Sequence, residues 1–178
     1  MKVHVPEMFT IPEYPSGYED LFIRTLKHDI KDLNGIFLAG PCIREKHYGL
    51  FQNWRDTAIE LFRKKDFQGD LFSPEPFCIN GYDDQIVWED IHLQQAKVIL
   101  FWIPRELNIQ PAFTSNVEFG EWMSSGKVIL GYPKNACKMN YLQMKAEKYK
   151  IPCADTLELT VDLAITKYKE LLAIAKYK

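Results

Sequence analysis

Apolar and polar positions follow one another in blocks that predict strands separated by helices. Short apolar runs bounded by Gly, Pro or Asn indicate buried strands, and apolar positions spaced three and four residues apart indicate helices that bury one face. On this basis strands are expected at 36–39, 71–72, 98–104 and 128–131, with a fifth near 150–153. Helices are expected at 54–65, 86–97, 115–125 and 140–150, with a long last helix from about residue 155.

Alternating strands and helices predict an α/β fold, because right-handed crossovers lay successive strands in parallel and cover both faces of the sheet. We therefore expect three αβα layers around a mostly parallel sheet of about five strands, in a single domain over 35–178. The segment before this domain shows the alternation of strands and helices less clearly. Residues 1–34 are expected to form an N-terminal arm packed on the domain, with an edge strand near residues 3–5 and a helix over 18–28.

Composition narrows the possible partners. The 178 residues are 47% hydrophobic, which favours a compact core, and a net charge of -2 removes the electrostatic case for binding a nucleic acid polymer. No apolar run approaches the ~18 residues of a membrane span, and the N-terminus is unlike a signal peptide, so a cytoplasmic protein is expected. Four cysteines without zinc-site spacing are interpreted as reduced thiols, and no motif for a metal, dinucleotide or ATP is present.

The segment 114–122 carries the strongest candidate chemistry. It follows an apolar strand, and in open α/β sheets ligands bind beyond the carboxyl ends of the strands. Glu118 in a first helical turn there has its anionic form favoured by the helix dipole and can act as a nucleophile or base. The alternative is structural, because Ser115 and Glu118 also have capping-box spacing. A further glycine in this helix, Gly120, suggests close approach of the sheet or a ligand.

Other candidates are more ambiguous. Glu89 and Asp90 are adjacent in a predicted helix and point about 100° apart, so at most one is expected to face a pocket, and a solvated helix face is the alternative. Gly40 and Pro41 end the first buried strand, either to let a ligand approach the backbone or as a plain turn. Arg55 can meet a phosphate together with the basic residues Arg44, Lys46 and His47, or all of these can be solvated charges.

Aromatic residues surround the proposed site in sequence. Trp88 and Trp122 can stack on a flat base or pack in the core, and for Trp102, which lies within a strand, core packing is expected.

Five segments together resemble the nucleoside 2-deoxyribosyltransferase family. They are Ile36–Pro41, Asn53–Arg55, Trp88–Glu89, Val98–Arg105 and Asn116–Gly120. The resemblance implies a flavodoxin-like fold, Glu118 as the nucleophile, Glu89 as an acidic contact to the sugar or base, and Asn116 as a sugar-hydroxyl contact. It also implies homo-oligomers, in which a C-terminal segment completes a neighbour's site. The apolar stripe of the last helix fits that role or packing on its own sheet.

Three functions remain open from the sequence. The first is transfer of a 2-deoxyribosyl group between nucleobases through a glycosyl-enzyme on Glu118, with Gly40 and Pro41 lining the pocket and no cofactor. The second is hydrolysis of the N-glycosidic bond of a nucleoside or its 5′-monophosphate, since related N-glycosidases share the fold. The third is a non-catalytic nucleotide-binding module. In the first two the partners are a small nucleoside or nucleotide and a free base.

Overall fold

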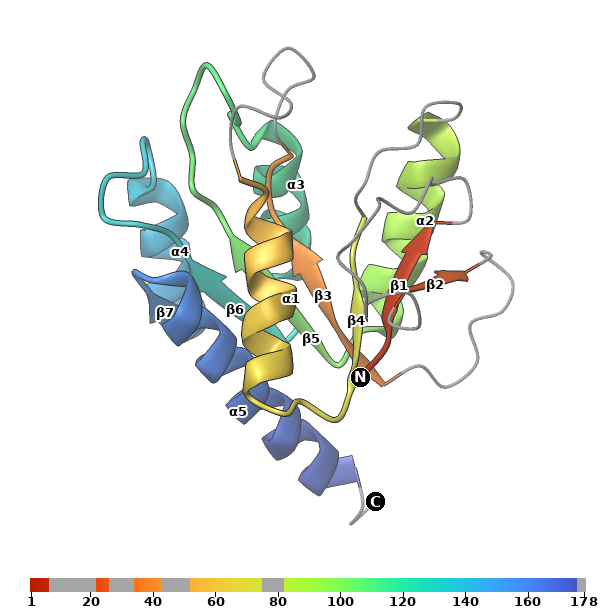
Figure 1. The fold of residues 1–178 in the computed structure, drawn as a ribbon. Coiled ribbons are helices and arrows are strands. Elements are labelled where there is room, and N and C mark those ends of the chain that lie inside the picture. Colours follow the sequence, from red (N-terminus) through yellow and green to blue (C-terminus); the bar gives the residue numbers. More distant parts are fainter. Residues whose placement is uncertain (7–21, 26–33, 43–51, 75–81, 176–178) are drawn as a thin grey trace.

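A seven-stranded, all-parallel sheet forms the centre of the molecule, seen in a computed structural model that describes residues 1–6, 22–25, 34–42, 52–74 and 82–175 (Figure 1). Its order is β2-β1-β4-β3-β5-β6-β7. The strands are β1 (Val3–Pro6), β2 (Phe22–Thr25), β3 (Gly35–Ala39), β4 (Asp70–Phe72), β5 (Val98–Trp102), β6 (Val128–Gly131) and β7 (Cys153–Ala154). The α/β class with three layers is thus confirmed, with seven strands in place of about five.

The strand order identifies the fold type. When strands are counted from β3, the last five lie in the order 2-1-3-4-5, which is the flavodoxin-like arrangement. The chain reverses its direction of winding between β3 and β5, which pair in parallel from Ile36 opposite Val98 to Ala39 opposite Phe101. A ligand site is therefore expected beyond the carboxyl ends of these two strands.

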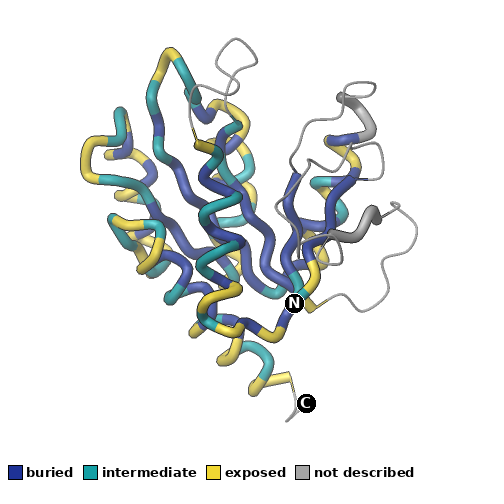
Figure 2. Tube along the Cα trace, in the orientation of Figure 1, coloured by how far each residue is buried: buried dark blue, intermediate teal, exposed yellow. Residues whose placement is uncertain are grey.

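The central strands are apolar because both of their faces are covered. All five residues of β5 and all five of β3 are buried, as the dark core of the trace shows (Figure 2). Such strands read as continuous hydrophobic runs rather than as alternating patterns. This explains why they were predictable from the sequence.

Helices cover the sheet in two layers (Figure 1). On one face α1 (Trp54–Lys64) and α5 (Leu157–Ala175) share a core cluster with the strands. On the other face α2 (Tyr82–Gln95), α3 (Phe113–Trp122) and α4 (Asn140–Tyr149) share a second cluster. Helix α1 begins as predicted, because the Asn53 side chain accepts a hydrogen bond from the Arg55 backbone N–H at 2.9 Å.

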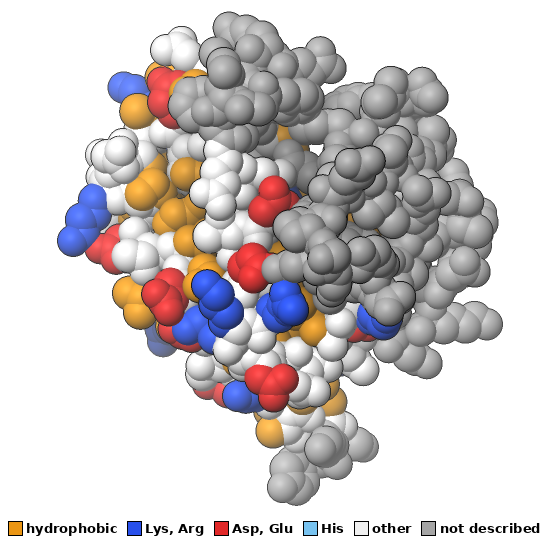
Figure 3. All heavy atoms as spheres, in the orientation of Figure 1, with side chains coloured by type: hydrophobic (Ala, Val, Ile, Leu, Met, Phe, Trp, Pro, Cys, Tyr) orange, Lys and Arg blue, Asp and Glu red, His pale blue; other side chains and the backbone are white. Residues whose placement is uncertain are grey.

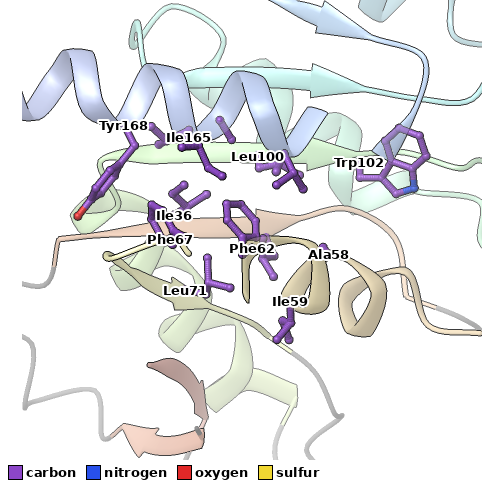
Figure 4. Close-up of a cluster of buried hydrophobic side chains, with 14 of the residues drawn as sticks. Ile36, Ala58, Ile59, Phe62, Phe67, Leu71, Leu100, Trp102, Ile165 and Tyr168 are labelled. Carbon is purple, nitrogen blue, oxygen red and sulfur yellow. The ribbon is translucent and has the colours of Figure 1, made fainter. Parts of the chain in front are cut away.

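The long stripe of the last helix packs on its own sheet. Figure 4 shows Ile165 and Tyr168 of α5 facing Phe62 of α1 over the strand residues Ile36 and Leu100. On the outer side of these helices acidic and basic side chains are interspersed (Figure 3), and Lys65 lies 2.8 Å from Asp162 and 3.4 Å from Glu158. Burying the apolar side against strands therefore leaves a charged, solvated side on α5.

The N-terminal segment differs from the prediction. β1 lies inside the sheet, paired on both sides, rather than at its edge. The helix expected over residues 18–28 is wrong for residues 22–25, which form the edge strand β2, while its other residues lie outside the described ones. Pairing with β1 explains the change for β2, because the edge of β1 offers backbone hydrogen-bonding groups that a helix could not use.

Smaller details complete the comparison. α2 begins at Tyr82, earlier than the expected residue 86. Cys42, Cys137 and Cys153 are thiols outside any disulfide, and Cys78 lies outside the described residues. None of the helices in the described ranges is long and apolar enough to cross a bilayer.

Candidate active site

A cavity of about 460 Å³ opens at the carboxyl end of β3, between α2 and α3. Its walls are the strand end from Phe37 to Cys42, one face of α2, and the segment from Pro111 through the first two turns of α3. It lies at the point where the order of the strands reverses, and its volume falls in the range of about 300–1,000 Å³ typical of small-molecule sites. Position and size both fit a small ligand.

Glu118 points into this cavity from α3. It shares the lining with Thr114, Val117 and Glu121, which lie four residues before, one before and three after it on the same side of the helix. Burial raises the pKa of Glu118 to about 7, the negative charge of Glu89 adds to the increase, and the positive charge of Arg55 opposes it. A carboxyl group that titrates near neutral pH inside a cavity is a candidate for catalysis.

The capping-box interpretation of Glu118 is wrong. α3 begins at Phe113, two residues earlier than expected, after Ala112 in a left-handed conformation with a φ of 59° and no side-chain cap hydrogen bond. Ser115 is therefore inside the helix and buried, and its Oγ has no hydrogen-bond partner among the described residues. Glu118 lies in the second turn, where the helix dipole stabilises its anion less than was expected for the first turn. The pKa of Glu118 is raised rather than lowered.

Two acids of α2 face Glu118. Both Glu89 and Asp90 line the cavity, contrary to the expectation that at most one could do so. The reason is the width of the helix surface that lines the cavity, which also includes Gln85, Ile86 and Leu93 and so spans the directions of both acids. Nε2 of Gln85 donates a 2.7 Å hydrogen bond to Oε1 of Glu89, which helps to orient that carboxylate.

Gly40 and Pro41 line the cavity at the end of β3. Gly40 has a φ of +149°, and a Cβ built there would lie 2.2 Å from the Trp102 carbonyl oxygen and 2.9 Å from the Trp54 ring. Only glycine fits this position, because the backbone conformation is rare for L residues and the neighbouring strand is too close.

Arg55 reaches the same strand end from α1. It is 2% exposed, donates from Nε to the Leu38 carbonyl at 3.0 Å and from Nη2 to the Gly40 carbonyl at 2.7 Å, and lies along the cavity lining. These bonds position the loop that carries Gly40, and the guanidinium partly neutralises the cavity. Arg44, Lys46 and His47, which the sequence grouped with Arg55, lie outside the described residues.

Three predicted site residues lie elsewhere. Trp88 is 3% exposed and stacks on His92, with ring centroids 3.7 Å apart, on the core side of α2. The Trp122 ring lies 4.4 Å from Nζ of Lys127. Asn116 is on the opposite side of α3, where its side-chain oxygen accepts a hydrogen bond from Nη2 of Arg105. None of the three is among the described residues that line the cavity.

Other lining residues escaped the sequence analysis, and helical spacing could have found them. Thr114 and Glu121 lie four residues before and three after Glu118, and Gln85 lies four residues before Glu89. Starting from each candidate acid, the i±3 and i±4 positions select the residues that share its side of the helix. Within the described ranges no group of three His, Cys, Asp or Glu residues is arranged to hold a metal ion.

The fold and the cavity together define a flavodoxin-like α/β protein with an acidic cavity at its switch point. The model of one family, described as nucleoside 2-deoxyribosyltransferase like, matches residues 34–136, more than half of the chain. The protein belongs to this family, whose members act on small nucleosides and bases, and membership supports a glycosyl-transfer or N-glycosidase role. All the described residues that line the cavity lie inside the matched segment. The curated proteins include no match.

Proposed function

We propose that this protein transfers a 2-deoxyribosyl group from one nucleobase to another through a glycosyl-enzyme on Glu118. The observation that carries the proposal is the position of this carboxyl group, which lies in the switch-point cavity with a pKa near 7 and makes no cap to its own helix. Membership of the family supplies the class of reaction.

The first step forms one bond and breaks another at C1′ of the donor. An ionised Oε atom of Glu118 attacks C1′, the N-glycosidic bond breaks, and its electron pair leaves with the base nitrogen, which takes up a proton. Positive charge develops on the sugar ring in the transition state. The carboxylates of Glu89 and Asp90 line the same cavity and can stabilise that charge, because fixed charges close to a developing charge lower the energy of the transition state.

The second step reverses the first with a new partner. A nitrogen of the acceptor base attacks C1′, the ester bond to Glu118 breaks, and the acceptor loses its proton as the carboxylate is restored. Gly40 and Pro41 form the surface on which the ligand rests, and Arg55 positions that surface. Holding sugar and base together in one cavity supplies orientation without a metal or cofactor.

The charge of the cavity favours an uncharged nucleoside over a monophosphate. Four carboxyl groups line its described part, at Glu89, Asp90, Glu118 and Glu121, and the only cation there is Arg55. The Arg55 donors described above point to backbone carbonyls of the strand end. A 5′-phosphate placed beside these carboxylates would be repelled.

The test is a base-exchange assay. The protein is incubated with a 2′-deoxynucleoside and a different free base, and the new nucleoside is separated and quantified. Mass spectrometry without acceptor should detect one deoxyribosyl group on the peptide that contains Glu118. Glu147→Gln, the same chemical change at an exposed position of α4 outside the cavity, is the control for Glu118→Gln.

Each outcome separates the candidate functions. Exchange that persists in Glu118→Gln would overturn the assignment of the nucleophile. Release of free base without acceptor, at the rate seen with acceptor, would indicate hydrolysis, and a preference for the 5′-monophosphate would strengthen that conclusion. Saturable nucleoside binding without any turnover would indicate a binding module.

A further inference from the structure

A second cavity, of about 400 Å³, lies on the other side of α3, between α3 and α4. Its polar lining consists of Arg105, Asn116, Lys138, Tyr141 and Lys145, beside Gly120. Three of these residues are cations, and the described lining includes no carboxylate. The basic cavity, as we call it, is therefore opposite in charge to the cavity that holds Glu118.

Arg105 is the unusual member of this group, because it is a buried charge without a carboxylate partner among the described residues. It is 5% exposed, and no ion pair to it occurs within the described ranges. Nη1 donates to the Lys138 carbonyl at 2.9 Å and Nη2 donates to the Asn116 side-chain oxygen, while Nε has no partner among the described residues. Buried charges are normally paired, so an anion is the expected missing partner.

Gly120 provides space beside these cations. A Cβ built at this position would meet no described atom within 4 Å, so the glycine is not required by close approach of the sheet, as the sequence analysis allowed. A glycine inside a helix destabilises it by ~1 kcal/mol relative to alanine. Here the missing side chain leaves an open wall on the basic cavity. The remaining explanation from the sequence analysis, approach of a ligand, fits this side of α3.

Two lysines stand at the rim. Lys138 comes shortly before α4, and Lys145 lies one turn into it, with Nζ 5.2 Å from the centroid of the Tyr141 ring. Neither lysine forms an ion pair within the described part of the chain. Solvated lysines alone would indicate little, but here they flank a buried guanidinium at the N-terminal end of a helix, where anions are favoured.

We infer that the basic cavity binds a phosphate monoester. An Arg fork and two lysines match the charge and geometry of a phosphate dianion. The cavity is larger than a bare phosphate needs, and Phe119, Leu142 and the exposed Tyr141 ring offer apolar contact to the organic part of the ligand. The inference goes beyond the proposed glycosyl transfer and does not depend on it, since the two cavities use opposite sides of α3.

Calorimetric titration with three probes tests the assignment on the full chain. Phenyl phosphate should bind, inorganic phosphate should bind more weakly, and phenol, which lacks the charge, should not bind measurably. Equal affinity for phenyl phosphate and inorganic phosphate would overturn the monoester assignment. No binding of either phosphate would overturn the site itself.

Variants locate the binding. Gly120→Leu places a side chain in the open wall and should abolish phenyl phosphate binding, while circular dichroism melting verifies that it is folded. Lys145→Gln, an exposed change with little risk to folding, should weaken binding about tenfold, as expected for the loss of one charge-assisted contact. Glu118→Gln should bind phenyl phosphate like the unaltered protein. Binding that survives both Gly120→Leu and Lys145→Gln would show that the ligand binds elsewhere.

Discussion

The two cavities beside α3 share a helix and differ in charge. One is lined by four carboxyl groups with a single guanidinium, and the other by three cations without a carboxylate among the described residues. The helical period explains how both arise from one short segment. Thr114, Val117, Glu118 and Glu121 face one cavity, while Asn116, Gly120 and Met123 face the other. Neighbours in sequence, such as Asn116 and Glu118, therefore belong to different sites.

The contrast also shows how similar-sized cavities can have opposite electrostatic consequences. In the acidic cavity, burial and neighbouring carboxylates raise the pKa of Glu118 to about 7, so its charge can change near neutral pH. In the basic cavity, burial lowers the pKa of Arg105, yet a guanidinium remains protonated at any ordinary pH. The first cavity is thus suited to covalent chemistry at a carboxylate, and the second to retaining an anion.

The largest expected effect is on the base-exchange rate, which should depend on the acidic cavity and not on the basic one. Glu118→Gln removes the nucleophile and should lower the base-exchange rate by at least about 10³-fold. Lys145→Gln, in the basic cavity, should leave that rate close to the unaltered value. Initial rates at saturating donor provide the measurement, and equal losses in the two variants would contradict separate roles for the cavities.

The next effect concerns stability and pH. The raised pKa of Glu118 means that the folded state holds this proton more tightly than the unfolded state does. Below about pH 4.5 the group is mostly neutral in both states. Between pH 4.5 and 7 the unfolded state ionises first, so the folded protein loses stability, and above pH 7 the loss is constant at about 3 kcal/mol.

Glu118→Gln removes that cost and should therefore stabilise the protein above pH 7, by an amount that nearly vanishes towards pH 4.5. Urea unfolding at pH 4.5 and pH 8 measures the difference, with Glu147→Gln on exposed α4 as the control. A variant less stable than the unaltered protein at pH 8 would indicate that Glu118 has a structural role after all.

A smaller effect tests the open wall of the basic cavity. Gly120→Ala should raise the free energy of unfolding by about 1 kcal/mol, because alanine is the better helix former and its Cβ meets no described atom within 4 Å. Denaturant titration gives the value. A loss of stability would mean that the protein itself occupies the space assigned to a ligand.

The smallest expected effect is a shift in the pH at which Glu118 ionises when a neighbouring carboxylate of the acidic cavity is removed. Glu89→Gln removes a negative charge that raises the pKa of Glu118, and should lower the midpoint of Glu118 ionisation. Asp90→Asn should shift it less, since its charge contributes less. Carbon NMR of labelled glutamate follows the ionisation independently of activity. An unchanged midpoint in Glu89→Gln would contradict the coupling across the cavity.

The sequence predicted the central strands and the candidate carboxyl group of Glu118 because apolar runs and short motifs depend only on neighbouring residues. β5 is five apolar residues with helices on both faces, and strands buried in this way read as continuous hydrophobic runs. Asn53 marks the start of α1 with its own side chain. In the N-terminal segment the strand near residues 3–5 was expected but β2 was not, since four residues such as Phe22–Thr25 form a strand only because a partner edge lies beside them.

The candidate site was predicted in part for the same reason. Glu118 and the turn at Gly40 follow strand ends, which is where ligands bind in this kind of fold. Whether Trp88 faces a ligand or the core depends on how α2 is rotated about its axis when it packs on the sheet. The structure places the Trp88 ring against His92. The start of α3 mattered in the same way. Because the helix begins two residues earlier than expected, Glu118 lies in its second turn and lines the cavity, and it does not cap the helix.

The amino-acid sequence by itself determined the α/β class, the order of the elements and the presence of a carboxyl group beyond a buried strand, since hydrophobic period and short motifs are properties of neighbouring residues. Only the tertiary structure decided which side of α3 meets which cavity, that Glu89 and Asp90 both face Glu118, and that Arg105 is buried with no carboxylate partner in the described part of the chain. Those relations join residues that are far apart in the chain, and their energies depend on burial and distance, which arise only when the elements pack.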